Sequence, residues 1–159
     1  MSDEKLNILM FSNNYDKALA GLILANSAID LGLTVTMFFS FWGLLLLRKP
    51  GTNTKKENNR LQNLFKSVTP EEPEQLPLSQ MNLSGLGQKM LKKMISDQQA
   101  PNLSSFLQKA RNNGVRFYGC KLSVEVMGFE KDELIPEVEI KTAEDYLKNA
   151  LKSEIQLFI

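Results

Sequence analysis

The residue with the clearest chemical potential is Cys120, which ends a short apolar run and precedes a predicted helical turn. At such a position the unpaired amide groups and the dipole of the helix start favour an anion. Lys121 adds a positive charge beside it, and together these conditions favour the thiolate, the reactive form of cysteine. The alternative is that Cys120 is simply a small buried apolar residue, as free cysteines often are. Spacing alone leaves both interpretations open.

Composition excludes most other chemistries. The 159-residue chain has no histidine and one cysteine, which excludes Ser-His-Asp and Cys-His catalysis, imidazole metal sites, internal disulfides and cysteine-based zinc clusters. A thiolate without histidine is poorly suited to hydrolysis, but it can attack sulfur, and backbone amides can stabilise the persulfide that forms. The net charge of +1 gives no electrostatic case for nucleic acid binding. No acidic cluster indicates a metal site, and we expect no cofactor.

Chemistry at Cys120 depends on the neighbouring loops, because sites in open parallel sheets collect at the carboxyl ends of strands. Three segments are predicted to reach that edge: 12–15 after the first strand, 40–43 after the second and 119–121 after the third. The pocket residues predicted from these segments are Asn13, Asn14, Tyr15, Phe41, Trp42, Gly43 and Lys121.

Strands and helices alternate along the chain that positions these loops. Short apolar runs predict strands at 6–12, 33–39, 115–119, 138–140 and 155–158. Apolar residues at helical spacing predict helices between them, at 16–31, 85–98, 103–112 and 142–151. This alternation predicts a single α/β domain with a mostly parallel five-stranded sheet.

A polar segment at about 49–80 interrupts the alternation. It is rich in Lys, Asn, Glu and Pro, with a short helix predicted near 60–66. We expect this insertion to be mobile, although its basic half could meet an acidic partner. Beyond it, Met81, Met90 and Met94 form a thioether-rich helix face. Core filling is the favoured interpretation of that face, and a soft lining for a sulfur pocket is the second.

The apolar stretch 33–47 is the candidate for a membrane segment. It is shorter than the roughly 20 residues that a spanning helix needs, and it turns from β-branched to leucine-rich at Gly43. We therefore interpret it as a buried strand followed by a partly buried helix, and expect no membrane span. The N-terminus lacks the features of a signal peptide, and a lone cysteine fits a reducing compartment. These observations predict a cytoplasmic protein.

The same stretch bears on self-association. FFSFWGLLLL at 38–47 places more apolar surface after the second strand than a short crossover normally hides, and large exposed patches usually mark interfaces. We therefore expect a homo-oligomer. The alternative is that the 49–80 insertion folds back and covers this surface within one chain.

Three segments resemble the DsrE/DsrF/DsrH-like family, most closely its stand-alone DsrE-like branch. GCKLSVEVMGF at 119–129 places Ser123 three residues after the cysteine and Met127-Gly128 seven residues after it. The others are LILANSAIDLGLTVTMFFSFWGLLLLRK at 22–49 and MNLSGLGQKMLKKM at 81–94. With the closing KTAEDYLKNAL, the resemblance spans nearly the whole chain. Lys121 and Leu122 depart from the uncharged polar residue and methionine that the family often has there.

The resemblance implies a flavodoxin-like domain with helices on both faces of the sheet, frequent oligomers, and persulfide sulfur on Cys120. Such proteins exchange sulfur with TusA-like carriers and rhodanese-like proteins. In this interpretation the amides of Leu122 and Ser123 stabilise the persulfide, and Phe41, Trp42 and Met127 wall the pocket. Two rival hypotheses are a non-catalytic module that binds a small ligand at the same edge, and a thiol peroxidase that needs a resolving thiol from another molecule.

Overall fold

The computed structural model describes residues 4–52 and 59–159, built around a five-stranded sheet whose strands all run parallel. Their order is β4-β3-β2-β1-β5. The strands are β1 (Lys5–Met10), β2 (Thr34–Phe39), β3 (Arg116–Cys120), β4 (Val138–Lys141) and β5 (Ile155–Phe158). The α/β class and the parallel five-stranded sheet predicted from the sequence are confirmed.

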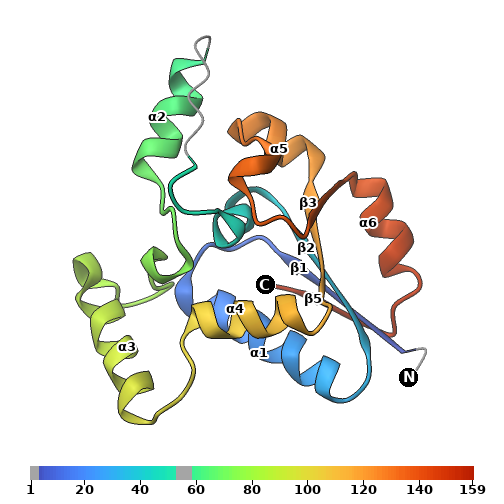
Figure 1. The fold of residues 1–159 in the computed structure, drawn as a ribbon, viewed down its shortest axis with the longest axis horizontal. Helices are drawn as coiled ribbons and strands as arrows, with labels where there is room; N and C mark the ends of the chain where they lie inside the picture. The colour runs from blue at the N-terminus through green and yellow to red at the C-terminus, as the bar shows by residue number, and fades with distance from the viewer. Residues whose placement is uncertain (1–3, 53–58) are drawn as a thin grey trace.

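Helices cover both faces of this sheet (Figure 1). On one face α1 (Tyr15–Asp30) packs against α4 (Leu103–Asn112), while α6 (Ala143–Ala150) lies on the other. Phe38 of β2 faces α6, with its ring 4.9 Å from that of Tyr146, and the next residue, Phe39, points the opposite way. The other helices are α2 (Arg60–Val68), α3 (Leu86–Asp97) and α5 (Lys121–Met127), with short 3-10 helices η1 (Phe41–Leu47), η2 (Pro73–Gln75), η3 (Leu83–Gly85) and η4 (Lys131–Glu133).

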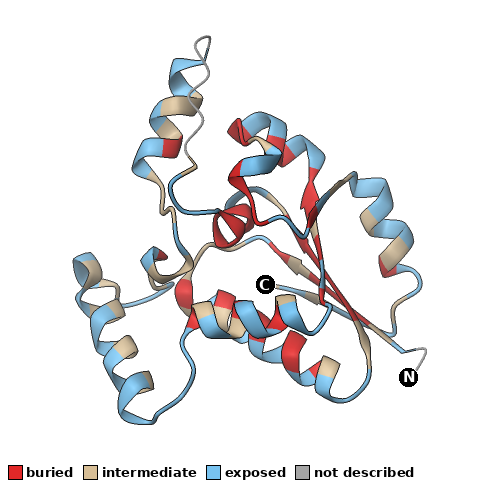
Figure 2. Cartoon of the chain, viewed as in Figure 1, coloured by how far each residue is buried: buried red, intermediate tan, exposed pale blue. Residues whose placement is uncertain are grey.

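The core lies between the sheet and the α1–α4 layer (Figure 2). Ile8 and Met10 of β1 are fully buried there. Small residues on α1 let that helix approach the strand closely: a Cβ added at Gly21 would lie 2.7 Å from the sulfur of Met10. This contact explains why the first helix is rich in alanine and glycine, because larger side chains would push it off the sheet.

The stretch 33–47 becomes β2 followed by η1, and it is more deeply buried than predicted. The partly buried helix expected after the strand is a 3-10 helix whose four leucines, 44–47, are fully buried. The apolar surface that FFSFWGLLLL exposes is therefore smaller than predicted: the chain covers the four leucines, while Phe41 and Trp42 are exposed. Self-association stays a prediction. None of the described helices is long and apolar enough to cross a membrane.

Part of the polar insertion at 49–80 is anchored to the rest of the molecule. Leu76 is fully buried, and Lys66 of α2 forms a buried ion pair with Glu133 of η4 at 2.8 Å. The predicted helix near 60–66 is α2. Residues 53–58 lie outside the described part of the chain, and mobility of the insertion stays a prediction.

The methionine face of α3 does not fill the core. Met90 and Met94 of α3 are more than half exposed, and so is Met81, which lies before η3 and not on α3. The face that α3 turns inward instead bears Leu91 and Ile95, which pack against the core only partly. The core-filling interpretation was wrong because helical periodicity shows that a helix has an apolar face but not whether another element covers it.

Candidate functional site

Cys120 lies where the sequence placed it, at the carboxyl end of a strand. It is the last residue of β3, between β2 and β4 in the sheet, and it is the N-cap of α5. Its side chain makes no capping hydrogen bond and is 8% exposed. The first amide groups of a helix have no partner within that helix. The thiol therefore stands next to the backbone donors that begin α5, close to the molecular surface.

Ser123 joins the start of α5 to the end of β2. Its side chain is fully buried, and its Oγ lies 3.1 Å from Oγ of Ser40, with either hydroxyl able to donate. Lys121 and Leu122 are exposed, and the Lys121 ammonium lies 4.0 Å from the Glu125 carboxylate. The Ser40–Ser123 contact thus joins the segment after β2 to α5, while Lys121 and Leu122 on the outer side of α5 face solvent.

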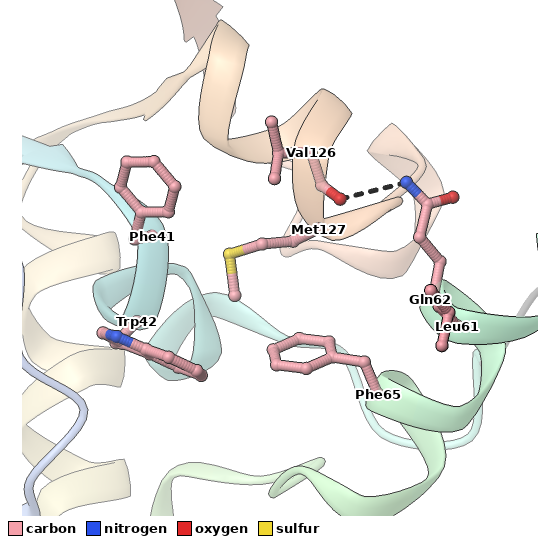
Figure 3. Close-up of a pocket in the computed structure, with 7 residues that line it drawn as sticks. All are labelled: Phe41, Trp42, Leu61, Gln62, Phe65, Val126 and Met127. Carbon is pink, nitrogen blue, oxygen red and sulfur yellow. Dashed lines mark hydrogen bonds between the residues drawn. The ribbon is translucent and has the colours of Figure 1, made fainter.

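A cavity of about 380 Å³ opens beside α5, between this helix, η1 and α2 (Figure 3). Its lining includes three of the predicted pocket residues but not Cys120. One lining residue is polar, Gln62, and its side-chain NH₂ donates to the carbonyl oxygens of Glu125 at 3.1 Å and Val126 at 3.0 Å. The lining residues are Phe41, Trp42, Leu61, Gln62, Phe65, Val126 and Met127.

The α2 wall of this cavity was missed by sequence reasoning. Leu61, Gln62 and Phe65 belong to the insertion that was expected to be mobile. Leu61 and Phe65 are four residues apart in a short predicted helix, a spacing that places them on one face. That spacing was the available signal, but nothing local indicated that the face would turn toward Trp42, whose ring lies 5.7 Å from that of Phe65.

Phe41 has an unusual backbone conformation. Its φ angle of 46° is in the left-handed region, which non-glycine residues seldom adopt because the Cβ approaches the backbone. The ring of Phe41 lies 6.3 Å from that of Phe11, in an edge-on arrangement. Residues held in such conformations require support from their surroundings and cluster at ligand sites and switch regions.

Tyr15 does not join Phe41 and Trp42, which corrects the predicted pocket. Its side chain is fully buried, and its hydroxyl donates to Glu74 at 3.3 Å and accepts from the Leu103 amide at 3.3 Å. Burial, followed by the effect of the Glu74 charge, raises the pKa of Tyr15 although the Leu103 amide opposes the shift. Tyr15 lines a different, polar cavity of about 340 Å³, together with Glu74 and Lys92. It joins elements of the fold and does not contact the cavity beside α5.

The other loop residues have mainly structural positions. Asn13 and Asn14 are partly exposed, and Asn14 is the N-cap of α1 without a side-chain capping bond. Gly43 is buried, and a Cβ there would lie 2.1 Å from the Met10 carbonyl oxygen, so only glycine fits. Neither Asn13, Asn14 nor Gly43 lines the cavity beside α5.

Comparison with known proteins supports the resemblance. The model of the DsrE/DsrF/DrsH-like family matches residues 2–158. This chain belongs to that family. It is 31% identical to the Bacillus subtilis protein YrkE over 156 residues, covering 98% of this chain and 97% of YrkE. It is 27% identical over 160 residues to the sulfur carrier protein DsrE2 of Allochromatium vinosum, with full coverage of both chains.

The fold also matches a solved structure. The crystal structure of the Escherichia coli YchN protein superposes with a TM-score of 0.57, covering 98% of this chain and 99% of YchN at 16% identity. This likeness concerns the fold alone. It agrees with a DsrE/DsrF/DrsH-like domain built on a parallel sheet, in which Cys120 occupies the end of an interior strand.

The chemistry available to this DsrE/DsrF/DrsH-like chain is that of a thiol beside backbone donors. Among residues 4–52 and 59–159, no group of three or more cysteine and carboxylate side chains is arranged to hold a metal ion. Cys120 can act as a nucleophile toward sulfur, and the amides that begin α5 can hydrogen-bond the anion that forms.

Proposed function

We propose that this protein carries sulfane sulfur as a persulfide on Cys120 and exchanges it with partner proteins. The observation that carries the proposal is the position of the chain's single thiol, at the end of an interior strand and at the start of a helix. Family membership supports it, as does full-length similarity to a protein named as a sulfur carrier.

The loading step needs only groups that the proposal names. The Cys120 thiolate attacks the outer sulfur of a donor persulfide, R–S–SH. A new S–S bond forms on Cys120, the S–S bond of the donor breaks, and the donor leaves as the thiolate R–S⁻ with the bonding electron pair. No net oxidation or reduction occurs, and the proton stays on the transferred sulfur or passes to solvent. Unloading to an acceptor thiolate is the reverse of this step. No histidine is required, which fits a chain that contains none.

The donors and acceptors fit small sulfur-carrying proteins of the TusA-like and rhodanese-like kinds. Leu122 and Val126 lie one helical turn apart on α5 and are both exposed, as is Trp42 of η1. An exposed apolar surface of this kind suits transient docking of another protein near the thiol. Self-association and a cytoplasmic location, where a single thiol stays reduced, complete the proposal.

Intact-mass measurement tests the proposal. After incubation with an inorganic polysulfide and removal of the excess, the wild-type protein should gain the mass of one or more sulfur atoms, and a thiol reductant should remove it. Cys120→Ser should fold normally and gain nothing. Sulfur gain by Cys120→Ser would overturn the carrier mechanism, because the variant has no thiol. Gain of oxygen alone, after peroxide treatment, would favour the thiol peroxidase.

Ser123→Ala provides a graded control for the same measurement. Its hydroxyl bonds to Ser40 and not to a group of the cavity, so its loss removes one hydrogen bond worth about 1 kcal/mol. We expect this variant to load sulfur partially or more slowly than wild type. Complete loss of loading with a normal melting temperature would show that the hydroxyl has a direct role at the thiol.

A further inference from the structure

The cavity beside α5 is held open by fixed walls. Gln62 of α2 bonds to the last turn of α5, and the buried Lys66–Glu133 ion pair ties α2 to η4. Arg48 donates from Nη1 to the carbonyl oxygens of Thr69 at 3.2 Å and Pro70 at 2.8 Å, just beyond α2. These contacts fix α2 at both its cavity-facing side and its C-terminal end, so the hollow is a preformed feature.

The residues that line the cavity indicate which chemical class of ligand it can bind. The lining bears no charged side chain, and the donor group of Gln62 is already engaged. A charged ligand would lose its hydration without gaining a partner, a loss that strongly opposes burial. The volume of about 380 Å³ falls within the range of small-molecule sites, which are lined mainly by apolar and aromatic side chains.

The lining of the cavity favours a ligand that contains an aromatic ring. The rings of Trp42 and Phe65 are tilted by 44° and do not stack on each other. Figure 3 shows the thioether of Met127 directed between them. Aromatic faces and a polarisable sulfur both interact well with an aromatic ring. The backbone of Phe41 is strained, with φ 46°, as residues at ligand sites often are; the same holds for Met81 and Leu83 beside the groove along α3.

The other hollows of the described structure suit such a ligand less. The cavity beside Tyr15 contains the ion pair of Lys92 with Glu74 at 3.2 Å. The groove of about 450 Å³ along α3 is lined by Met81, Met90 and Met94, all more than half exposed. The first is polar, and the lining of the second contains the carboxylate of Asp16 and no aromatic side chain.

We propose that the cavity between α2, η1 and α5 is a binding site for an uncharged, apolar small molecule that bears an aromatic ring. This site is distinct from Cys120, which does not line it, and it does not depend on the sulfur chemistry proposed above. The Cys120 loop and the cavity share α5, so a molecule bound at Val126 and Met127 contacts the opposite end of the helix that Cys120 begins.

The test uses N-phenyl-1-naphthylamine, a neutral aromatic probe whose fluorescence rises in apolar sites. The chain has one tryptophan, Trp42, so energy transfer from Trp42 to the probe reports binding to this protein, and variants of the lining then locate the site. We expect saturable binding of one probe per chain with quenching of Trp42, and Cys120→Ser should bind the probe as wild type does. Absence of saturable binding, or binding without any effect on Trp42, would overturn the site.

A matched pair of variants locates the probe. Val126→Asp puts a carboxylate at the cavity wall, and Val68→Asp makes the same change on α2, outside the lining. Val126 is 55% exposed and Val68 is 72% exposed, each near a helix C-terminus, so both variants should fold. We expect Val126→Asp to weaken probe binding about tenfold or more and Val68→Asp to change it about twofold or less.

Two outcomes would contradict the proposal. Equal weakening by both variants would show general surface adsorption of the probe. A lower oligomer mass for Val126→Asp than for wild type, with no saturable probe binding in either, would show that a second protein copy covers the cavity. Melting temperatures of both variants check that loss of binding is not loss of folding.

Discussion

Two loops that leave neighbouring strands have opposite surroundings. After β1 the chain turns into α1 at Tyr15, whose hydroxyl is enclosed by Glu74 and the start of α4. After β2 it enters η1, where Phe41 and Trp42 are each more than one-third exposed and line an apolar cavity. In the first loop, the hydrogen bonds of Tyr15 to Glu74 and to the Leu103 amide join α1 to η2 and α4. Beside the second loop, α2 contacts η1 through the rings of Phe65 and Trp42 and forms the far wall of the cavity.

The comparison indicates which of the two loops can bind a ligand. In the first loop the Glu74 carboxylate accepts from the Ser104 amide at 3.0 Å and from its hydroxyl at 3.1 Å, as well as from Tyr15. These polar groups already have partners, so a ligand would have to displace them. In the second loop Phe41 and Trp42 present apolar surface to the cavity, and covering this surface releases water without breaking a hydrogen bond.

The largest expected effect is on α2, which forms the far wall of the cavity beside the second loop. Lys66→Met removes the ammonium that pairs with the buried Glu133 carboxylate at 2.8 Å, and loss of one partner of a buried pair typically costs about 3–5 kcal/mol. We expect urea denaturation to show a loss of this size, and N-phenyl-1-naphthylamine binding to weaken because α2 loses an anchor. The control Lys109→Met breaks the exposed pair with Asp30, for which we expect about 1 kcal/mol or less.

A second variant distinguishes loss of charge pairing from loss of side-chain packing. Lys66→Met combined with Glu133→Gln removes both charges and keeps an oxygen that can accept from the Glu130 amide, as the Glu133 carboxylate does at 2.7 Å. The double variant should therefore recover most of the stability that the single variant loses. If the double variant were as unstable as the single one, packing and not charge would hold α2 in place.

A smaller effect is expected at the first loop, and it depends on pH. Burial alone would raise the pKa of Glu74, but hydrogen bonds from Ser104 and the charge and hydrogen bond of Lys92 outweigh burial and lower the pKa below its ordinary value of 4.5. A lowered pKa in the folded state contributes stability above the unfolded pKa and loses it as the pH falls through the folded pKa. Glu74→Gln should therefore be about 1–2 kcal/mol less stable than wild type at pH 7.

That stability difference should shrink below about pH 4.3 as the carboxylate of the wild-type protein takes up a proton. Urea denaturation of both proteins between pH 7 and pH 3 measures it. Glu144→Gln, which removes an exposed partner of Lys148, serves as the control with little expected change. A difference that stays constant across this pH range would show that the Glu74 charge does not stabilise the first loop.

The smallest effect concerns the strained residue of the second loop. Phe41→Gly and Phe41→Ala both lose the ring, but only glycine is free of Cβ strain at a φ of 46°. We expect the glycine variant to be more stable than the alanine variant by about 1 kcal/mol, as measured by thermal or urea unfolding. Equal stability, or greater stability of the alanine variant, would show that the backbone at Phe41 is not strained.

The sequence predicted which loops meet but not which way their side chains point. Apolar runs gave the strands, and the strand-end rule brought Tyr15, Trp42 and Cys120 to one edge of the sheet. The side chain of Tyr15 points away from the cavity beside α5 because its hydroxyl bonds to Glu74, which is 59 residues distant along the chain. No local sequence pattern predicts such a contact. For the same reason the leucines at 44–47 proved to be covered and the methionines of α3 proved to be exposed.

The family resemblance predicted the family and a role for Cys120, which hydrophobic periodicity alone did not predict. The motif around Cys120 indicated a DsrE/DsrF/DsrH-like chain, and the family match over residues 2–158 confirms it. The α2 wall of the cavity was not predictable in this way, because Phe65 meets Trp42 only after the insertion folds back. Side chains brought together by such long-range contacts can be predicted only once the packing of the whole chain is known.

The most direct test of the central claim locates the sulfur. The wild-type protein is loaded with polysulfide, its persulfide is blocked with an alkylating reagent, and the peptide that contains Cys120 is fragmented by tandem mass spectrometry. The carrier account predicts a fragment series in which one or more additional sulfur atoms lie between the Cys120 sulfur and the alkyl group. A Cys120 peptide that is alkylated directly, without additional sulfur, after saturating treatment would contradict it.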